Sequence, residues 1–221
     1  MAKVEFYIPT RGSPHSLARY LACAEAHKHG TTAREVTREP VTLARNQATR
    51  MFLKTDATHM LMVDDDTVIM TRDTIGRLLA LDADIAAGLV PWWDGGVGLI
   101  LNAQREPNVW LRPWPTGTFA VHHVGTAIMM IARPVFELIE WPWFQWRESR
   151  AGDYQGEDLD FCRKAREKGC SIMVDAAVIG DHFKTIPLTA MCPPLPEDGD
   201  FYFRDYTKPI DLPRVDGDDA D

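Results

Sequence analysis

Three consecutive aspartates, Asp64, Asp65 and Asp66, follow directly after the apolar stretch His59 to Val63. Adjacent carboxylates repel one another, so placing three together costs free energy unless a positive charge lies between them. Two carboxylates that converge in a crevice offer the oxygen ligands that a hard divalent cation prefers. A turn or a helix cap is the alternative, because aspartate is common in both. We therefore take Asp64 and Asp66 as candidate metal ligands.

Two further sets of residues suited to chemistry lie in the second half of the chain. Glu157 and Asp158 open the segment "GEDLDFCRKAREKG", and His182 belongs to "VIGDHF". A positioned carboxylate can act as a general base, and a histidine can bind a metal. Each set also has a purely structural alternative. Acids at a helix start complement the helix dipole, and a single histidine is commonly hydrogen-bonded in a turn.

The elements that must position these residues alternate between strand and helix. Apolar runs predict strands, and a 3.6-residue period with capping residues predicts helices. We expect strands at Val4 to Ile8, His59 to Val63, Ile85 to Val90, Val124 to Ala132 and Ser171 to Val174. We expect helices from a Ser13 cap to about His29, over Thr42 to Lys54, from a Thr71 cap to about Leu81, after Pro134, and over Gly156 to Gly169. This alternation predicts an α/β domain with a mostly parallel central sheet and helices on both faces.

The predicted sheet gives the three aspartates a position. In an open α/β sheet, ligands bind beyond the carboxyl ends of the strands. Asp64, Asp65 and Asp66 lie at such an end. Because successive side chains of a strand alternate, we expect Asp64 and Asp66 to point to one side of the sheet and Asp65 to the other.

The composition is that of an ordinary globular protein of 221 residues, with 45% hydrophobic and 25% charged residues. No apolar run reaches the length of a membrane span, and "MAKVEFYIPT" enters a strand without a signal-peptide segment. We therefore expect a cytoplasmic protein. The four cysteines are scattered without a CxxC pair, which favours neither a disulfide framework nor a zinc site.

Acidic residues concentrate near the C-terminus. The segment Glu197 to Asp221 holds nine acidic and three basic residues, so it accounts for −6 of the net charge of −8. We expect residues 191–221 to form a Pro- and Asp-rich extension whose last part is solvated. The remainder of the chain is nearly neutral and has no long basic stripe, so we expect no nucleic-acid partner.

Four motifs, in the order in which they occur, resemble those of the GT-A glycosyltransferases, particularly the family 2-like enzymes. They are "YIPTRG", "LARNQATRMFLKTDATHMLMVDDD", "GEDLDFCRKAREKG" and "VIGDHF", and the resemblance covers about Lys3 to Phe183. It implies a GT-A-like domain over residues 1–190 that moves a sugar from a nucleotide-diphosphate sugar to an acceptor hydroxyl. It also implies that a D-x-D motif holds Mn²⁺ or Mg²⁺ against the diphosphate of the donor.

The resemblance assigns roles to individual residues. Asp64, Asp66 and His182 are the implied metal ligands, and an imidazole ligand favours Mn²⁺ over Mg²⁺. Asp158 is the implied general base, with Glu157 as the competing candidate, and such a base favours an inverting mechanism. The implied nucleotide pocket is lined by Pro9, Thr10, Arg11, Arg45, Asn46, Asp64 and Asp65.

All seven tryptophans lie between positions 92 and 146. Tryptophans are more often core residues than ligand platforms, because each one buries a large area. The segment "WPWFQWR" (Trp141 to Arg147) is too dense in Trp, with too much Pro and Arg, for a simple core strand. We expect one or two of its rings to form a wall on which a sugar acceptor stacks.

Two alternative functions remain open at this stage. A sugar nucleotidyltransferase or a metal-dependent nucleotide-sugar hydrolase is the alternative enzyme, although nucleotidyltransferases usually carry a Gly-rich loop where "YIPTRGSPHS" offers one glycine. A non-catalytic module that binds carbohydrate or nucleotide-sugar is the other alternative. The presence of Asp64, Asp66, Asp158 and His182 together argues against a module that has lost its activity.

Overall fold

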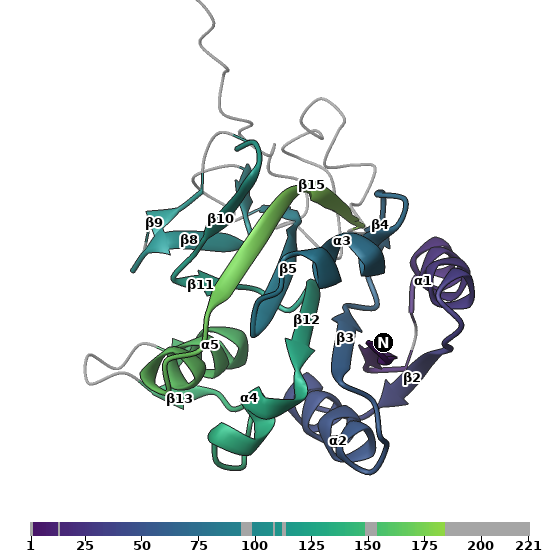
Figure 1. Cartoon of the computed structure of the whole chain (residues 1–221), viewed down its shortest axis with the longest axis horizontal. Helices are drawn as coiled ribbons and strands as arrows, with labels where there is room; N and C mark the ends of the chain where they lie inside the picture. Colours follow the sequence, from purple (N-terminus) through teal and green to yellow (C-terminus); the bar gives the residue numbers. More distant parts are fainter. Residues whose placement is uncertain are drawn as a thin grey trace, which may run out of the picture. The chain divides into compact units, whose positions relative to one another are not determined.

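The computed structural model describes residues 2–12, 14–93, 99–107, 109–111, 114–148 and 154–183. Its main feature is an eight-stranded sheet with the strand order β10-β15-β5-β12-β3-β1-β2, in which β4 pairs with one end of β15 (Figure 1). The strands are β1 (Val4–Thr10), β2 (Ala33–Thr37), β3 (His59–Val63), β4 (Thr67–Ile69), β5 (Ile85–Leu89), β10 (Thr118–Ala120), β12 (Ile128–Ala132) and β15 (Ile172–His182).

Most strands of this sheet run in one direction. β1 is parallel to β2 and β3, and β5 is parallel to β15. β12 lies between β3 and β5 and is antiparallel to both, so β3 and β5 share a direction. β4 and β10 run antiparallel to β15. The predicted mostly parallel sheet is therefore confirmed, with one antiparallel strand in its interior.

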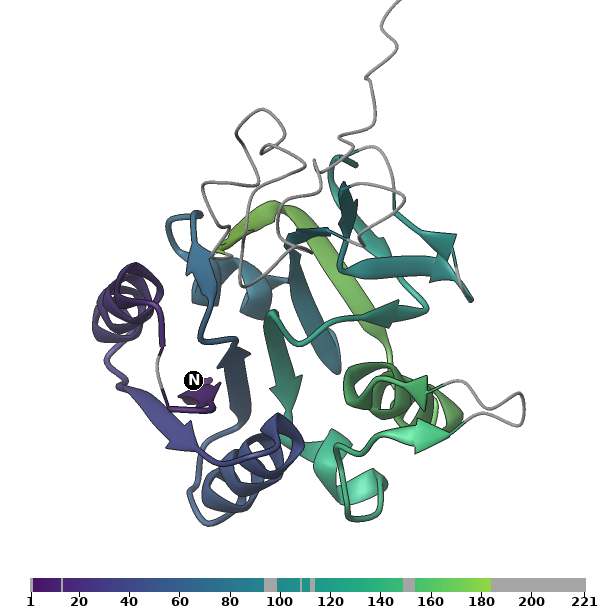
Figure 2. The same cartoon turned by 180° about the vertical axis from the view of Figure 1, so that it is seen from behind.

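Helices pack on both faces of the sheet (Figures 1 and 2). One face carries α1 (Ser16–Lys28) and α3 (Thr74–Ala80), and the other carries α2 (Val41–Leu53), α4 (Arg133–Leu138) and α5 (Glu157–Glu167). Side chains of β1 alternate between the two cores: Phe6 and Ile8 pack with α1 and α3, whereas Tyr7 packs on the side of α2. The predicted α/β class is confirmed.

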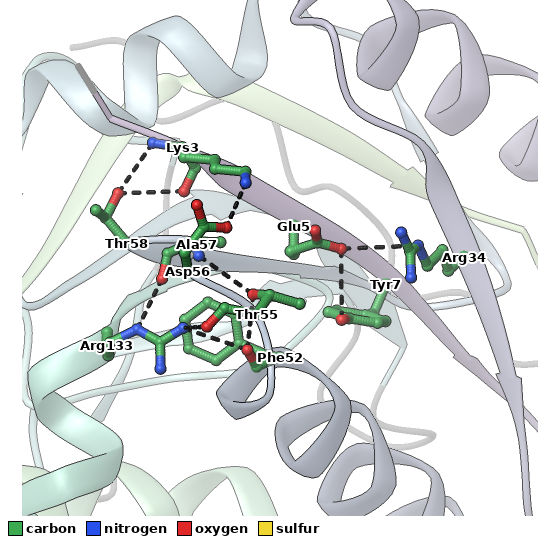
Figure 3. Close-up of polar contacts among 10 residues, drawn as sticks. All are labelled: Lys3, Glu5, Tyr7, Arg34, Phe52, Thr55, Asp56, Ala57, Thr58 and Arg133. Atoms are coloured by element: carbon green, nitrogen blue, oxygen red, sulfur yellow. Dashed lines mark hydrogen bonds and ion pairs between the residues drawn. The ribbon is translucent and has the colours of Figure 1, made fainter.

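Arg133 holds the end of α2 at the edge of the sheet opposite to the aspartates. Its guanidinium donates hydrogen bonds to the carbonyl oxygens of Ala57 at 2.7 Å, Thr55 at 2.8 Å and Phe52 at 3.3 Å (Figure 3). Its central carbon also lies 4.6 Å from the centroid of the Phe52 ring. Thr55 and Ala57 lie in the loop after α2, so Arg133 supplies hydrogen-bond donors to the carbonyls of that loop, whereas the Phe52 carbonyl also accepts from the N–H of Thr55.

Smaller sheets occur within the tryptophan-rich stretch and before α5. β8 (Ala103–Glu106) pairs with β9 (Val109–Trp110) and β11 (His123–Val124), β6 (Pro91–Trp93) pairs with β7 (Leu99–Leu101), and β13 (Arg147–Glu148) pairs with β14 (Tyr154–Gln155). The strand predicted over Val124 to Ala132 is therefore divided between β11 and β12. Residues 125–127 separate the two strands, and the N–H of Gly125 donates to the carbonyl of Asn102 at 2.7 Å.

The first helix starts later than the sequence predicts. The predicted cap Ser13 lies outside the described residues, and α1 begins at Ser16 with His15 before it. The N–H of His15 donates to the carbonyl of Asp65 at 2.8 Å. This tertiary hydrogen bond holds His15 at the aspartate turn and so delays the helix.

The predicted Thr71 cap of α3 is wrong. The helix begins at Thr74, and Asp73 precedes it with a positive φ of 63°. The Thr71 hydroxyl is used elsewhere: it donates to the carbonyl of Ala177 and accepts from the N–H of Ile179, both at 2.8 Å. Thr71 therefore fastens an irregular part of β15 instead of starting a helix.

None of the helices in the part of the chain that the structure describes is long and apolar enough to cross a membrane. The predicted extension over residues 191–221, and the predicted domain boundary at residue 190, lie outside the described residues. Their interpretation remains a prediction.

Candidate functional site

Asp64, Asp65 and Asp66 form a turn at the end of β3 rather than a continuation of the strand. The N–H of Thr67 donates to the carbonyl of Asp64 at 3.0 Å, which closes the turn. Three neighbouring segments hold its backbone, through the hydrogen bonds Asp64 N–H to Ala127 O at 3.2 Å, His15 N–H to Asp65 O at 2.8 Å and Phe183 N–H to Asp66 O at 2.9 Å. The directions of the three carboxylates are therefore set by a turn with a fixed backbone.

Arg45 of α2 links the aspartate turn to the start of α5. Its side chain is only 5% exposed, and Nη2 donates to Asp64 Oδ1 at 2.8 Å while Nη1 donates to Glu157 Oε1. Burial alone would lower the pKa of Arg45, but the charges of Asp64 and Glu157 outweigh it, and the pKa is raised. Arg45 is thus a permanent cation shared by two carboxylates from distant parts of the chain.

Asp158 lies one residue further along α5, where its side chain is partly buried and lines the pocket. Its Oδ1 accepts a hydrogen bond from the N–H of Leu159 at 2.8 Å. Gly125 and Gly156 leave room for the carboxylate, because a Cβ added at either glycine would lie 3.3 Å or 2.8 Å from an Asp158 oxygen. Burial raises the pKa of Asp158 to about 6, with Glu157 adding to the rise and Arg45 opposing it. A carboxylate with this pKa can exchange a proton near neutral pH.

Asp66 meets His182, which lies 116 residues further along the chain. His182 Nε2 is 2.9 Å from Asp66 Oδ2. The contact depends on the length of β15, because the strand continues beyond the predicted Ser171 to Val174 and pairs its last residues with β4. An irregular stretch between Val174 and Ile179 separates the two halves of β15.

One pocket collects groups from both sides of the site. It has a volume of about 330 Å³, and it is lined by Asp64, Val90, Trp92, Asn102, Trp110, Gly125, Thr126, Ala127, Trp146, Gly156, Asp158, Leu159 and His182. Asp64, Asp158 and His182 supply its titratable groups, and three tryptophans supply much of its apolar wall. A concave, mostly apolar cavity with a few convergent polar groups is the usual form of a small-molecule site.

The tryptophans of "WPWFQWR" have three different environments. Trp143 is buried and donates from Nε1 to the carbonyl of Phe136 at 3.1 Å. Trp141 is exposed, with the guanidinium of Arg50 5.4 Å from its ring centroid. Trp146 is 55% exposed and lines the pocket. Of this segment, Trp146 is the ring placed to meet a ligand in the pocket.

Trp92, Trp110 and Asn102 belong to the pocket, but sequence reasoning did not single them out. The rings of Trp92 and Trp110 meet edge to face with centroids 5.7 Å apart. Asn102 is buried, and its Oδ1 accepts from the N–H of Val90 at 2.8 Å. The clustering of tryptophans was a usable signal, but their order in the sequence did not indicate which ones face the pocket.

The predicted nucleotide residues are dispersed. The Thr10 hydroxyl donates to Asp65 Oδ2 at 2.6 Å, which points Asp65 toward β1. Asn46 is buried and uses its amide on the backbone of Phe144, donating to its carbonyl at 2.7 Å and accepting from its N–H at 3.2 Å. Pro9 is buried and Arg11 is exposed. Among the described residues that line the pocket, Asp64 is the one that belongs to the predicted nucleotide-binding set. The nucleotide role of the others remains a prediction.

The predicted metal ligands are brought together in part. Asp66 and His182 are in contact, and His182 shares the pocket with Asp64, whose Oδ1 faces Arg45. Within the described ranges, one set of three acidic or histidine residues has ligand atoms that all lie within 4.8 Å of one another. The set consists of Glu25, His29 and Asp73. Asp64, Asp66 and His182 do not form such a compact set.

Comparison with known proteins shows a likeness of fold alone. No protein-family model matches this chain, and no curated protein matches its sequence. Among solved structures, A197 from STIV is similar with a TM-score of 0.62 and 20% identity, over 83% of this chain and 86% of that chain. GalNAc-T7, solved with UDP, GalNAc and Mn²⁺, is similar with a TM-score of 0.49 and 14% identity, over 82% of this chain and 37% of that chain. The chain shares the overall fold of A197, and the predicted α/β class with a mostly parallel central sheet is confirmed.

Proposed function

We propose that this protein is a glycosyltransferase that moves a sugar from a nucleotide-diphosphate sugar to an acceptor hydroxyl. The observation that carries the proposal is the convergence of Asp64, Asp158 and His182 on one tryptophan-lined pocket at the carboxyl edge of the sheet. Ligands of open α/β sheets bind at this edge. Tryptophan rings offer flat apolar surfaces suited to the faces of sugar rings.

Asp158 is the group proposed to act as the general base. Its pKa of about 6 leaves it ionised at neutral pH and able to accept a proton from an acceptor hydroxyl. Glu157 is less suited to this task, because Arg45 holds its carboxylate within the core. A base on the acceptor side agrees with an inverting mechanism, in which the acceptor oxygen attacks from the face opposite to the leaving diphosphate.

Asp66 and His182 are the residues proposed to hold Mn²⁺. Their ligand atoms lie 2.9 Å apart, and a carboxylate with an imidazole is a donor set that suits Mn²⁺. Asp64 and Asp65 belong to the same turn as Asp66, but Arg45 balances the charge of Asp64, and Asp65 accepts from the Thr10 hydroxyl. When bound, a divalent cation would neutralise the charge of the leaving diphosphate. Asp64, which Arg45 orients, is proposed to face the donor from the pocket side.

A nucleotide-sugar hydrolase is the second candidate, since it would use the same donor and the same metal. The tryptophan wall favours transfer to a sugar, because a hydrolase needs room only for water. Measurement of donor consumption with and without added saccharide acceptors separates the two activities. Acceptor-independent release of free sugar at the full rate would favour the hydrolase.

Thermal unfolding with UDP-, GDP-, CDP- and dTDP-sugars, each with Mn²⁺ or with EDTA, tests donor binding. A donor at a hundred times its Kd should raise the free energy of unfolding by about 2.7 kcal/mol. We expect the increase with Mn²⁺ and its loss in Asp66→Asn. The matched control is Asp181→Asn, which changes an exposed carboxylate next to His182. Donor binding of equal strength in EDTA would contradict the metal assignment.

A further inference from the structure

A second group of ligand atoms lies away from the pocket, where the end of α1 meets the start of α3. Glu25 and His29 are four residues apart on α1 and its C-terminal end, and Asp73 immediately precedes α3. His29 Nε2 lies 2.9 Å from Asp73 Oδ1 and 3.4 Å from Glu25 Oε1. One ligand atom from each residue falls within 4.8 Å of the other two. No motif in the sequence pointed to this group.

The histidine nitrogen in this group is buried but makes no hydrogen bond of good geometry. Nε2 is shielded from solvent and lies close to oxygens of both carboxylates, but neither contact meets the geometric criteria of a hydrogen bond. Buried polar atoms are nearly always paired, so such an atom needs an explanation. Glu25 is itself 7% exposed, and its Oε1 already accepts from the N–H of Ile75 at 2.9 Å, which fixes its direction.

We propose that Glu25, His29 and Asp73 bind a divalent cation of the Zn²⁺ class. Zinc takes imidazole and carboxylate ligands at about 2.0–2.2 Å, so two ligand atoms of a tetrahedral site lie roughly 3.4 Å apart. The observed separations of 2.9 Å and 3.4 Å are close to this value. An ion between the three atoms would also give the unpaired Nε2 a partner. Three protein ligands leave the fourth position for water.

This site would act on the fold rather than in the proposed reaction. Glu25 and His29 belong to α1, whereas Asp73 belongs to the segment that leads from β4 into α3. A bound ion would therefore join two segments that cover the same face of the sheet. Lys28 Nζ is 3.4 Å from Asp73 Oδ1, but both side chains are half exposed, so this lysine can move away when a cation binds. The alternative is a metal-free ion pair in which protonated His29 joins the two carboxylates.

Calorimetric titration of Zn²⁺ into the full-length, chelator-treated chain tests the proposal. We expect a Zn²⁺ equivalent that is lost in His29→Gln and that is separate from any Zn²⁺ bound at Asp66 and His182. Two controls should keep it: His27→Gln, which changes an exposed histidine in the same helical turn, and Asp66→Asn, which changes the proposed donor metal site. Glu25→Gln keeps an oxygen for the Ile75 N–H but removes the charge, and it should weaken binding by at least about 10-fold, the cost of changing even an outer-shell partner.

The outcomes separate this proposal from the proposed function. Zn²⁺ binding that persists unchanged in both His29→Gln and Glu25→Gln would overturn it, as would the absence of the equivalent from the parent chain. Loss of the equivalent in Asp66→Asn instead would assign the ion to the donor site and also overturn it. If His29→Gln does not fold, the Glu25→Gln titration decides alone. Donor binding plays no part in any of these results.

Discussion

Replacement of Asp158 by asparagine should stabilise the protein while removing its activity. Burial holds the pKa of Asp158 at about 6, against an ordinary value of 3.8, so the fold opposes the charged form. That difference corresponds to roughly 2–3 kcal/mol of stability lost at pH values above 6. Asparagine carries no charge, and its side-chain oxygen can still accept the hydrogen bond from the N–H of Leu159.

The gain should depend on pH in a defined direction. Below about pH 3, Asp158 is mostly protonated in the folded and unfolded states alike and takes little from stability. As the pH rises toward 6, the unfolded chain releases this proton more readily than the folded protein does, so the free energy of unfolding falls. The difference between parent and Asp158→Asn should therefore be nearly complete above about pH 7 and small near about pH 4.

Urea unfolding at several pH values between 4 and 8 measures this difference. The control is Asp181→Asn, which removes an exposed carboxylate and should change stability little at any pH. In parallel, sugar transfer by Asp158→Asn should fall by about 10²-fold or more if Asp158 is the base. A stability difference that is the same at pH 4 and pH 8, or a net loss of stability at pH 8, would refute the electrostatic reasoning.

Three further substitutions test other parts of the structure. Arg45→Met should lower the free energy of chemical unfolding by about 3–5 kcal/mol, because it leaves Glu157 buried without a counter-charge. The control Arg50→Met, on the exposed side of α2, should lower it by less than about 1 kcal/mol. Equal losses would show that the buried charge is not the cause. Arg133→Met should lower the free energy of unfolding by about 2–3 kcal/mol, because it removes the donors to the carbonyls of Thr55 and Ala57 in the loop after α2, and an unchanged urea midpoint would contradict this role. Trp146→Ala should raise the KM for a saccharide acceptor by about 10-fold, the worth of an aromatic contact, without changing donor binding in the thermal assay; a weakened donor instead would place the ring in the donor site.

The sequence predicted the main sheet well because its central elements have strong apolar patterns. His59–Val63 and the helix over residues 41–53 were expected almost to the residue. β2 was missed because Val36 is its one buried residue among exposed ones, as befits an edge strand. The two helix starts were predicted wrongly because the N–H of His15 and the hydroxyl of Thr71 bond to distant segments. Local capping rules cannot account for such contacts.

The sequence singled out several residues of the candidate site but not the contacts between them, and the roles of these residues remain predictions. Asp64, Asp158 and His182 could be placed near one another because each follows a strand or opens a helix at the same edge of the sheet. The sharing of Arg45 between Asp64 and Glu157 could not be foreseen, because it joins residues 19 and 112 positions away. Asn46, next to Arg45 in the sequence, turns away to the Phe144 backbone.

The irregular stretch of β15 restricts how this chain can vary in length. From Val174 to Ile179 the strand advances five residues while its neighbour β5 advances two, from Ala87 to Leu89, so β15 carries three extra residues there. Strand side chains alternate with a period of two, so a change of one residue in this stretch would send the following side chains to the opposite face. His182 would then turn away from Asp66. In natural or designed variants, insertions and deletions of a single residue between positions 174 and 179 should therefore be selected against more strongly than substitutions at the same positions.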